Sequence, residues 1–499
     1  MSSLDGTAID VVGGGFGGLS TACYLADAGA EVRVLEKNEQ LGGRASRLEE
    51  DGFRFDMGPS WYLMPDVFER FFGHFGKAPE DYYELERLDP HYRIFFKDGD
   101  QVDVPADRDQ VREIFESYED GAGEAFDEYL EESERNYEIA MENFVYTDRP
   151  RLRDWVDLDV IKAAPIGLKL IGNMQGHVED YFEHPKLQQI MQYTLVFLGG
   201  SPKNTPALYN MMGHVDFNLG VHYPERGLGS VVDAMVDLGD ELGVEYVTDA
   251  PVDEITRRKR GFLVATEDGE EYNPDLVVSD ADYAHTEREL LPEHERQYSD
   301  DYWDGRTYAP SAFLMYWGVE GDVEELAHHT LVLPEDWDPH FRQIFDDPQW
   351  PDEPAYYLCV PSKTDETVVP DGDTDSYSNL FVLVPIAPDL EDGEEIRAEY
   401  REKILDDIAE NTGVELRDRI VFEEDFCVSD FAERYNSIQG TALGLAHTLK
   451  QTAILRPDHR SSEVDGLYYT GSFTTPGIGV PMCLISGQHT ADAVIDDQV

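Results

Sequence analysis

The sequence has few basic residues, few cysteines and no long apolar run. Its 499 residues include 39 Lys and Arg against 104 Asp and Glu, which gives a formal net charge of −65. A chain this acidic repels polyanions, so we expect no nucleic-acid partner. The 41% hydrophobic and 11% aromatic content argues against general disorder. We interpret the acidity as an adaptation to a salt-rich cytosol, as in extreme halophiles, because concentrated salt screens the self-repulsion. An acidic binding surface is the alternative.

The four cysteines are scattered through the chain, at Cys23, Cys359, Cys427 and Cys483, with no CxxC pair. We therefore expect reduced, structural thiols and no metal site. No stretch approaches the ~20 apolar residues of a membrane span. The N-terminal residues lack the basic region and apolar core of a secretion signal. These absences predict a cytoplasmic protein that meets a membrane only peripherally, on its cytoplasmic face.

Residues 8–45 contain the motif around which the chain is organised. Residues 8–12 and 31–35 are typical of strands, and residues 19–29 of a helix that ends at Gly29. Between the first strand and the helix, three glycines match GxGxxG, and an acidic residue follows roughly 20 residues later. The strand–turn–helix context therefore predicts a dinucleotide-binding site.

Each residue of this motif has a distinct role in binding a dinucleotide. Gly13 permits the tight turn, Gly15 lets the backbone approach a pyrophosphate, and Gly18 lets the helix pack close to the strand. The helix N-terminus presents free N–H groups and the positive end of its dipole to the phosphates. Glu36 at the end of the second strand can accept hydrogen bonds from the adenosine ribose.

The segments that follow distinguish FAD from NAD. Gly42 and Gly43 permit a second close backbone approach, and Arg44 offers a charged fork for a pyrophosphate. Glu36, residues 41–44 and residues 57–59 resemble the N-terminal FAD site of the flavin amine oxidase and carotenoid desaturase superfamily. The resemblance implies an α/β fold, in which a Rossmann-like FAD-binding domain is joined to a mixed sheet-plus-helix substrate domain, as in flavin amine oxidases.

The C-terminal region makes the resemblance more specific. A predicted strand at 467–470 runs into Gly471, and a helix begins near Met482. The helix N-terminus and the loop amides can stabilise negative charge on the N1–C2=O edge of a reduced flavin. This region, residues 222–229 and the strand at 275–282 resemble the bacterial-type phytoene desaturases. The similarity spans nearly the whole chain.

One departure from that family lies beside the expected flavin. The family usually has Gly-Ala-Gly-Thr-His-Pro-Gly, whereas this chain has Phe473 and Thr475 in place of a glycine and the histidine. The departure weakens the case for phytoene as the substrate. With the motifs above, the resemblance implies that FAD is bound by Gly13, Gly15, Phe16, Gly17, Gly18, Glu36, Lys37, Gly43, Arg44, Gly58, Pro59, Ser60, Val252, Asp280, Gly471, Ser472, Pro481 and Met482.

The order of predicted elements returns the chain to the nucleotide sheet twice. We predict a discontinuous FAD-binding domain and a substrate or membrane-facing domain that fills the gaps. The FAD-binding domain comprises residues 1–100, 220–286 and 436–499. The substrate domain comprises residues 101–219 and 287–435.

Acid-free windows are informative in so acidic a chain. They occur at 11–26, 184–215, 436–457 and 466–491, and each is expected to be buried or to face ligand or lipid. Residues 160–174, with Lys162 and Lys169 on one helical face, fit a membrane-interface helix or a buried helix equally well. Residues 184–198 fit a pocket wall or plain core. Residues 107–143 are expected to form an exposed helical cap without chemistry.

The resemblance implies a desaturase acting on a long apolar isoprenoid. Flavin N5 can accept the hydride, so the protein need supply no nucleophile. No residue stands out as a base, although His214, His222 and Tyr223 lie near the family motifs. Quinone or oxygen would reoxidise the flavin, and both acceptors remain open.

The salt-adapted composition and the altered loop favour 3,4-desaturation of an acyclic C50 carotenoid, on the branch that leads to bacterioruberin. Phytoene desaturation is the main alternative. A flavin amine oxidase and a non-enzymatic prenyl-binding protein are more distant alternatives.

Overall fold

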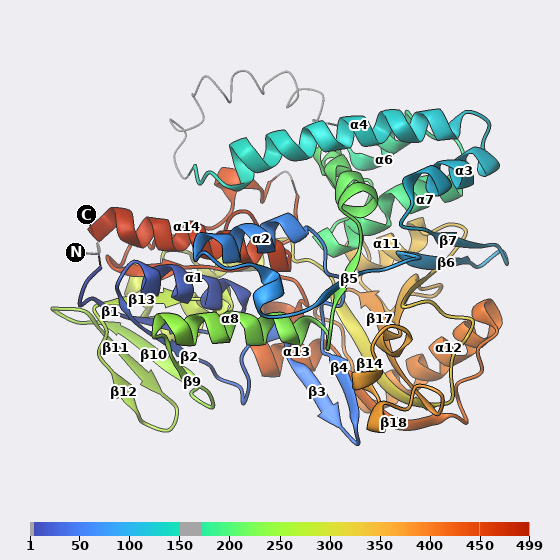
Figure 1. Cartoon of the computed structure of the whole chain (residues 1–499). Helices are drawn as coiled ribbons and strands as arrows, with labels where there is room; N and C mark the ends of the chain where they lie inside the picture. Colours follow the sequence, from blue (N-terminus) through green and yellow to red (C-terminus); the bar gives the residue numbers. More distant parts are fainter. Residues whose placement is uncertain (1–3, 150–171, 449, 499) are drawn as a thin grey trace.

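The computed structural model describes residues 4–149, 172–448 and 450–498. Two large sheets organise the chain (Figure 1). A five-stranded parallel sheet has the order β19-β13-β1-β2-β9, and a seven-stranded mixed sheet has the order β18-β14-β17-β16-β15-β6-β7. This arrangement confirms the predicted α/β fold with a mixed second sheet.

The parallel sheet is assembled from segments far apart in sequence. Its strands are β1 (Ala8–Val12), β2 (Glu31–Leu35), β9 (Glu245–Val247), β13 (Leu276–Ser279) and β19 (Leu467–Tyr469). All of its pairings are parallel, with β1 at the centre between β13 and β2. The apolar and β-branched run of β1 fits a strand covered on both faces. The sheet is therefore discontinuous in sequence, as the motif order predicts.

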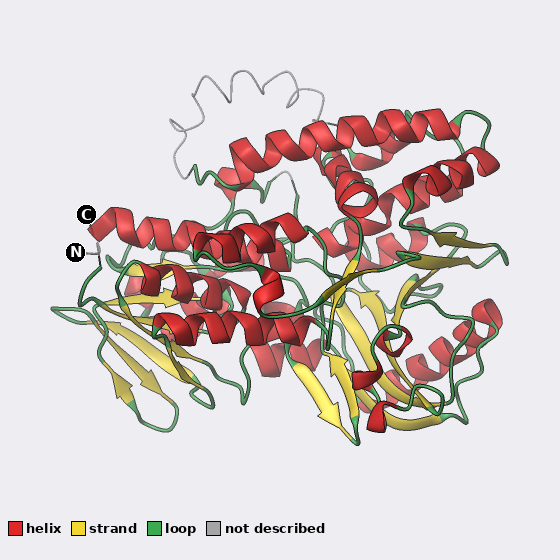
Figure 2. Cartoon of the chain, in the orientation of Figure 1, coloured by secondary structure: helices red, strands yellow, loops and turns green. Residues whose placement is uncertain are grey.

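The two faces of the parallel sheet are covered differently (Figure 2). Helices pack on one face, where Ile9 and Val11 share a core with apolar residues of the helices. These helices are α1 (Phe16–Asp27), α2 (Pro65–His74), α8 (Leu228–Leu242) and α14 (Val480–Gln498). An antiparallel three-stranded sheet covers the other face, packed on Val12 and Val277. Its strands are β10 (Val252–Arg257), β11 (Phe262–Thr266) and β12 (Glu271–Tyr272).

The seven-stranded sheet separates two further cores. Along β14 (Ser311–Glu320), Phe313 and Met315 face a core shared with α12 (Glu394–Thr412). The alternate residues Ala312 and Leu314 face the opposite core, which is covered by α3 (Arg108–Tyr118), α4 (Ala122–Ala140), α6 (Met174–Glu179) and α7 (Pro185–Gln192). This period of two is that of a buried strand. The other strands are β6 (Tyr92–Phe96), β7 (Gln101–Val104), β15 (His329–Leu333), β16 (Tyr356–Cys359), β17 (Tyr377–Ile386) and β18 (Ile420–Phe426).

The hairpin of β6 and β7 corrects one predicted boundary. The sequence places residues 1–100 in the FAD-binding domain, and the hairpin itself is confirmed. However, β6 pairs in parallel with β15, so residues 92–100 belong to the seven-stranded sheet. This pairing joins residues more than 200 positions apart in sequence, and no local pattern indicates it. The other domain boundaries stay a prediction.

The remaining elements connect and cover the two sheets. Two small antiparallel pairs are β3 (Arg47–Glu50) with β4 (Phe53–Asp56) and β5 (Leu85–Arg87) with β8 (His222–Pro224). The remaining helices are α3 (Arg108–Tyr118), α4 (Ala122–Ala140), α6 (Met174–Glu179), α7 (Pro185–Gln192), α9 (Tyr283–His285), α10 (Asp300–Asp304), α11 (Asp338–Phe345) and α13 (Val428–Tyr435). In Figure 1, α4 runs along the top of the molecule, above α2 and α14.

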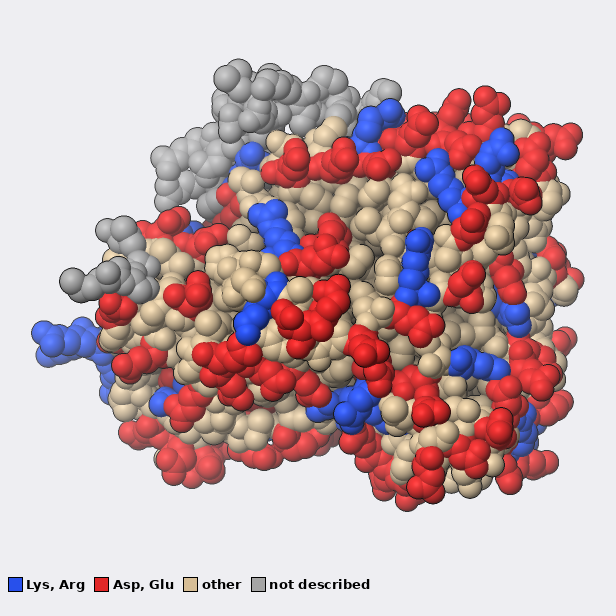
Figure 3. Space-filling view, in the orientation of Figure 1, with Lys and Arg blue, Asp and Glu red and all other residues tan. Residues whose placement is uncertain are grey.

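The surface reflects the composition. Acidic side chains are spread over the whole visible face, with Lys and Arg scattered between them (Figure 3). In the described part of the chain, the exposed large hydrophobic side chains are Val421, Ile454 and Leu455. Within residues 4–149, 172–448 and 450–498, no helix combines the length and the apolar character needed to cross a bilayer. The predicted helix at 160–174 lies mostly outside the described residues.

Candidate cofactor and substrate cavity

One cavity of about 1110 Å³ joins the parallel sheet to the seven-stranded sheet. Every residue of the predicted FAD site except Gly18 lies on its wall: Gly13, Gly15, Phe16, Gly17, Glu36, Lys37, Gly43, Arg44, Gly58, Pro59, Ser60, Val252, Asp280, Gly471, Ser472, Pro481 and Met482. Its volume exceeds the ~300–1,000 Å³ of a usual small-molecule site. The cavity therefore has room for more than a compact ligand.

The turn between β1 and α1 forms a cradle that only glycine allows. Gly13 has a φ of 101°, and a Cβ there would lie 2.9 Å from the main-chain nitrogen of Ala281. A Cβ at Gly18 would overlap the carbonyl oxygen of Gly13. Gly18 therefore acts behind the cavity, by letting α1 approach β1. Gly15 caps α1 without a side-chain hydrogen bond, which leaves helix N–H groups at the cavity.

Glu36 closes the same end of the cavity at the tip of β2. Its Oε2 accepts a hydrogen bond from the Gly14 N–H at 2.8 Å, and its Oε1 accepts from the Asn38 N–H at 2.8 Å. The neighbouring Lys37 donates to Asn436 Oδ1 at 2.8 Å. The Glu36 carboxylate is thus fixed at the cavity wall, where an acceptor for ribose hydroxyls is expected.

Arg44 carries an unused donor into the cavity. Its Nη2 donates to Ser437 Oγ at 3.1 Å. Its buried Nε has no hydrogen-bond partner within the described residues. A buried guanidinium N–H without an acceptor is costly, and a phosphate oxygen would satisfy it. The glycine cradle and this donor together fit a bound pyrophosphate.

Asp280 places a carboxyl group against the glycine cradle. It follows β13, and its Oδ2 would lie 2.7 Å from a Cβ at Gly15. Burial raises the pKa of Asp280 to about 7, although the main-chain N–H groups of Gly18 and Gly15 oppose this rise. The Glu36 charge raises the pKa further and Arg44 lowers it. The charge of Asp280 therefore changes close to neutral pH.

The C-terminal loop reaches the cavity opposite the N-terminus of α1. Gly471 has a φ of 91°, and its N–H donates to Ser486 Oγ at 2.9 Å. A Cβ at Gly17 would lie 2.8 Å from Gly471 Cα, so the two glycines let the segments meet. The loop then leads into the N-terminus of α14, which begins at Val480.

The two departures from the family pattern have different surroundings. Thr475 lines the cavity, and its hydroxyl is 2.9 Å from His459 Nε2. Phe473 is not among the residues on the cavity wall, and its place beside the flavin stays a prediction. It packs in the core beneath, with its ring 6.1 Å from that of Trp303. Because its ring is apolar, it packs in the hydrophobic core next to the loop. Thr475 is therefore the altered position that a ligand would meet.

Apolar side chains from the seven-stranded sheet form the other part of the wall. They come from three strands, from α11 and from the residue that precedes it: Ala312, Leu314, Leu331, Leu333, Leu383, Phe341 and Trp337. His340 lies among them, buried, with neither ring nitrogen hydrogen-bonded within the described residues. From the predicted pocket wall at 184–198, Tyr193 lines the cavity, while Ile190, Met191 and Leu195 are buried in core.

The sequence predicts that residues 107–143 form an exposed helical cap with no part in a functional site, and helix α4 shows that this prediction is wrong. Asn136, Tyr137, Ile139 and Ala140 line the cavity. The charged face of the helix is exposed as expected, but its opposite face is turned inward. The amphipathic pattern indicates that one face is covered, but it cannot indicate that a cavity lies beneath.

The base candidates from the sequence do not reach the cavity. His214, His222 and Tyr223 are absent from its wall, whereas His285, His340 and His447 line it. His447 Nε2 accepts the Ile478 N–H at 3.0 Å, so Nδ1 carries the proton of the neutral ring and donates to the Tyr209 hydroxyl. His447 lies in an acid-free window, 436–457, which was the one signal for it in the sequence.

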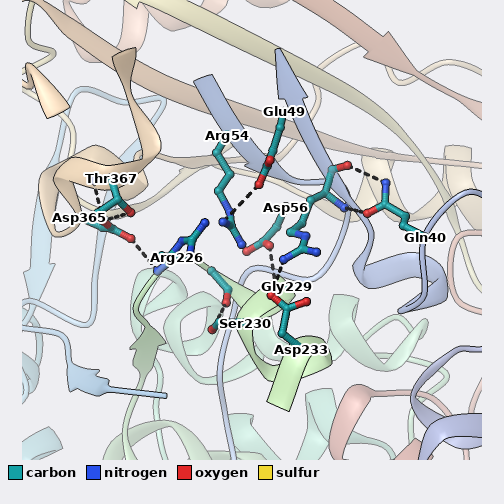
Figure 4. Close-up of polar contacts among 12 residues, drawn as sticks. Gln40, Glu49, Arg54, Asp56, Arg226, Gly229, Ser230, Asp233, Asp365 and Thr367 are labelled. Atoms are coloured by element: carbon teal, nitrogen blue, oxygen red, sulfur yellow. Dashed lines mark hydrogen bonds and ion pairs between the residues drawn. The ribbon is translucent and has the colours of Figure 1, made fainter. Parts of the chain in front are cut away.

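The family-like segment 222–229 supports the site from outside the cavity (Figure 4). The buried Asp56 carboxylate accepts from the N–H groups of Leu228 and Gly229 at the start of α8, at 2.8 and 3.1 Å. The Arg226 N–H donates to Asp365 at 2.7 Å. Because Asp56 lies two residues before the cavity residues 58–60, these contacts tie α8 to the wall.

The thiols are unpaired, as expected. Cys23, Cys359 and Cys427 are buried, but Cys483 lies on the cavity wall. Ligand atoms of Cys359, His328 and His329 lie within 4.8 Å of one another. A tetrahedral zinc site holds its ligand atoms about 3.5 Å apart, so this cluster does not form a ready site. The absence of a metal stays a prediction.

Comparisons with known proteins agree with this geometry. The family model of flavin-containing amine oxidoreductases matches residues 16–495. The carotenoid 3,4-desaturase of Haloarcula japonica is 76% identical over 497 residues, with all of both chains covered. The 4,4'-diapophytoene desaturase (4,4'-diaponeurosporene-forming) of Staphylococcus haemolyticus is 32% identical and covers 98% of this chain and 99% of its own.

Two solved structures share the fold. Putrescine oxidase bound to putrescine aligns with a TM-score of 0.62 at 14% identity and covers 98% of this chain and 99% of its own. Cyclohexylamine oxidase from Brevibacterium oxydans aligns with a TM-score of 0.58 at 15% identity and covers 99% of each chain. At such identity they show the fold alone, which confirms the predicted flavin amine oxidase-like architecture.

Proposed function

The chain belongs to the flavin-containing amine oxidoreductase family, and we propose that it is an FAD-dependent carotenoid 3,4-desaturase. The observation that carries the proposal is that the glycine cradle and the apolar wall belong to one cavity. A wall of this kind suits a polyene. The choice of bond follows the 3,4-desaturase that is 76% identical over the full chain. We further propose a C50 substrate, on the branch leading to bacterioruberin.

The residues on the cavity wall divide the binding of FAD among them. Glu36 would hold the ribose, while the N-terminus of α1 and Arg44 would hold the pyrophosphate. The loop that begins at Gly471 and the N-terminus of α14 would hold the flavin ring. When bound, the flavin supplies the acceptor for the hydride taken from the substrate. The protein then has to orient the polyene and exclude water, which the apolar wall does.

The pKa of Asp280 predicts a pH dependence of FAD binding. Below about pH 7 the carboxyl is neutral, and above it a buried negative charge faces the pyrophosphate. We therefore expect the FAD dissociation constant to rise about tenfold between roughly pH 6 and 8, the scale of one pKa unit of interaction. Asp280→Asn should remove this dependence. Fluorescence titration of the deflavinated protein measures it, and a wild-type affinity that does not vary with pH would refute it.

We propose that substrate enters from a lipid surface, at the edge of the cavity formed by residues 452–455. Thr452 and Ala453 line the cavity, and the next two side chains, Ile454 and Leu455, are 39% and 53% exposed. This edge lies in the acid-free window 436–457, so no carboxylate in that segment opposes an anionic membrane. A water-insoluble carotenoid would pass directly from the bilayer into the cavity. The protein would thus be peripheral to the membrane, on its cytoplasmic face.

The double substitution Ile454→Asp and Leu455→Asp should abolish vesicle binding. It removes two exposed apolar side chains, each of which gains about 1.5–3 kcal/mol when fully buried, and adds charge. We expect at least a tenfold loss in co-flotation with lipid vesicles, with flavin content unchanged. Val421→Asp is the matched control, since Val421 on β18 is at least as exposed as Ile454 and Leu455 but does not adjoin residues of the cavity wall in sequence. Equal loss in both variants would contradict a docking role for residues 454 and 455.

A product assay in concentrated salt tests the function. The purified protein, with FAD and lipid, receives phytoene in one sample and a C50 dihydro precursor in another. A red shift only from the coloured precursor supports 3,4-desaturation, whereas visible absorbance growing from colourless phytoene overturns it in favour of a phytoene desaturase. Amine turnover with peroxide release would favour an amine oxidase. Absence of flavin absorbance would favour a prenyl-binding protein. Samples with quinone or with air distinguish the two electron acceptors.

A further inference from the structure

Arg456 is a buried cation whose hydrogen bonds all go to the main chain. It is 5% exposed. Its guanidinium donates to the carbonyl oxygens of five residues, at 2.6–3.3 Å: Leu445, Gln451, Ser472, Phe473 and Thr474. Three of these carbonyls belong to the loop that follows Gly471. Arg456 therefore holds the loop that forms part of the cavity wall.

No carboxylate balances this charge in the described residues. The groups that affect its pKa most, after burial, are Tyr209, Cys483 and Tyr302, none of which is charged at neutral pH. Burial lowers the pKa of Arg456 to about 10, so the guanidinium stays protonated. Asp148 and Asp458 share a small neighbouring cavity of about 80 Å³ with Arg456 but form no ion pair with it. A buried charge without a counter-ion is strongly unfavourable, in a chain with 104 acidic residues.

The position of Arg456 indicates where a balancing negative charge would arise. A Cβ at Gly477 would lie 3.2 Å from Arg456 Cζ, so the guanidinium lies directly behind the turn at 475–479. Thr475, Pro476 and Ile478 of this turn line the cavity. The N-terminus of α14 begins one residue later, at Val480, and adds its positive dipole end. Two sources of positive potential therefore meet at one stretch of the wall.

We propose that Arg456 is a positioning residue that stabilises the negative charge a flavin gains on reduction at this wall. This rests on the proposed function only in requiring that flavin binds. In the desaturation, one C–H bond breaks and its electron pair leaves with the hydrogen as hydride. The adjacent C–H bond also breaks, its hydrogen leaves as a proton to water, and its electron pair forms the double bond. Arg456 would offset, without reorganisation, the one negative charge that a flavin bound at this wall would gain with the hydride.

Sulfite binding tests the proposal without any substrate. Sulfite adds to flavin N5 and leaves the same negative charge on the ring. We expect Arg456→Gln to raise the sulfite dissociation constant at least about tenfold and to lower the flavin midpoint potential. Arg456→Lys keeps the charge and should stay within about threefold of wild type. Arg419→Gln is the matched control, because Arg419 also donates to main-chain carbonyls, but to those of Glu320 and Asp322 near the end of β14 rather than to those of the loop after Gly471.

Flavin content is measured first, because it distinguishes a failure of the proposed function from a failure of the role proposed for Arg456. A wild-type protein that binds no flavin overturns the proposed function itself. A folded Arg456→Gln variant with wild-type flavin content, sulfite affinity and potential overturns only the role of Arg456. If that variant fails to fold, the absorption spectrum of the reduced wild-type protein tests the role of Arg456 instead. The reduced protein at about pH 6, where free reduced flavin is protonated at N1, should show the anionic form. A neutral reduced flavin there overturns the proposal.

Discussion

Gly18→Ala is expected to yield a protein that purifies without flavin. A Cβ at this position would overlap the main-chain carbonyl oxygen of Gly13 and would lie 3.1 Å from the Asp280 side chain. Because the first of these atoms is backbone, no side chain can rotate to relieve the overlap. Helix α1 must then move away from β1, and its N-terminal N–H groups move off the pyrophosphate. We expect flavin occupancy, measured as flavin absorbance per protein, to fall at least about tenfold.

The matched control is Gly73→Ala in α2. Gly73 also lies in a helix, but a Cβ there meets no atom within 4 Å. Alanine favours a helix over glycine by about 1 kcal/mol, so this variant should keep its flavin and gain thermal stability. Full flavin occupancy in Gly18→Ala would show that the close approach of α1 to β1 is not needed for binding.

Ala312→Trp is expected to retain flavin but to lose desaturation by about a hundredfold, equivalent to about 2.7 kcal/mol in the activation free energy. Ala312 lies on β14, with its side chain on the apolar wall of the cavity and away from the glycine cradle. An indole there occupies space that the polyene needs. Product formation and flavin occupancy are measured on the same preparation.

Ala398→Trp is the control for the cost of adding a tryptophan. Ala398 is exposed on α12, which covers the opposite face of the seven-stranded sheet. We expect wild-type activity from it. If Ala312→Trp desaturates its substrate at the wild-type rate, the substrate does not occupy this part of the cavity.

The proposed FAD site was largely predictable because its motifs are local. Residues 8–36 contain two strands, a glycine turn and a terminal acid, and each follows from a short-range pattern. The cofactor role of residues 471–482 was predicted from their resemblance to the bacterial-type phytoene desaturases. The structure brings these separate segments to one cavity and leaves only Gly18 behind the wall. That position agrees with the packing role predicted for it.

The substrate side was less predictable because long-range packing determines it. Tyr357 reaches the cavity only because β16 pairs with β15 and β17, and its hydroxyl then lies 2.9 Å from Ser60 Oγ. The hairpin at 92–104 was recognised, but its parallel pairing with β15 was not. Helix α4 is a second example. Its amphipathic sequence pattern predicts that one face is covered, but it does not predict that this face lines a cavity.

The position of β19 has a consequence for biosynthesis. This strand, Leu467–Tyr469, completes the parallel sheet against β13, and the loop and helix that follow it close the cavity. The ribosome makes these residues more than 400 positions after the glycine turn and Glu36, so a nascent chain carries that turn long before it has the C-terminal wall of the cavity. This part of the wall can therefore form around a cofactor only after residues 467–482 have left the ribosome. A chain truncated before residue 467 would keep the fingerprint in its sequence and yet assemble no holoenzyme.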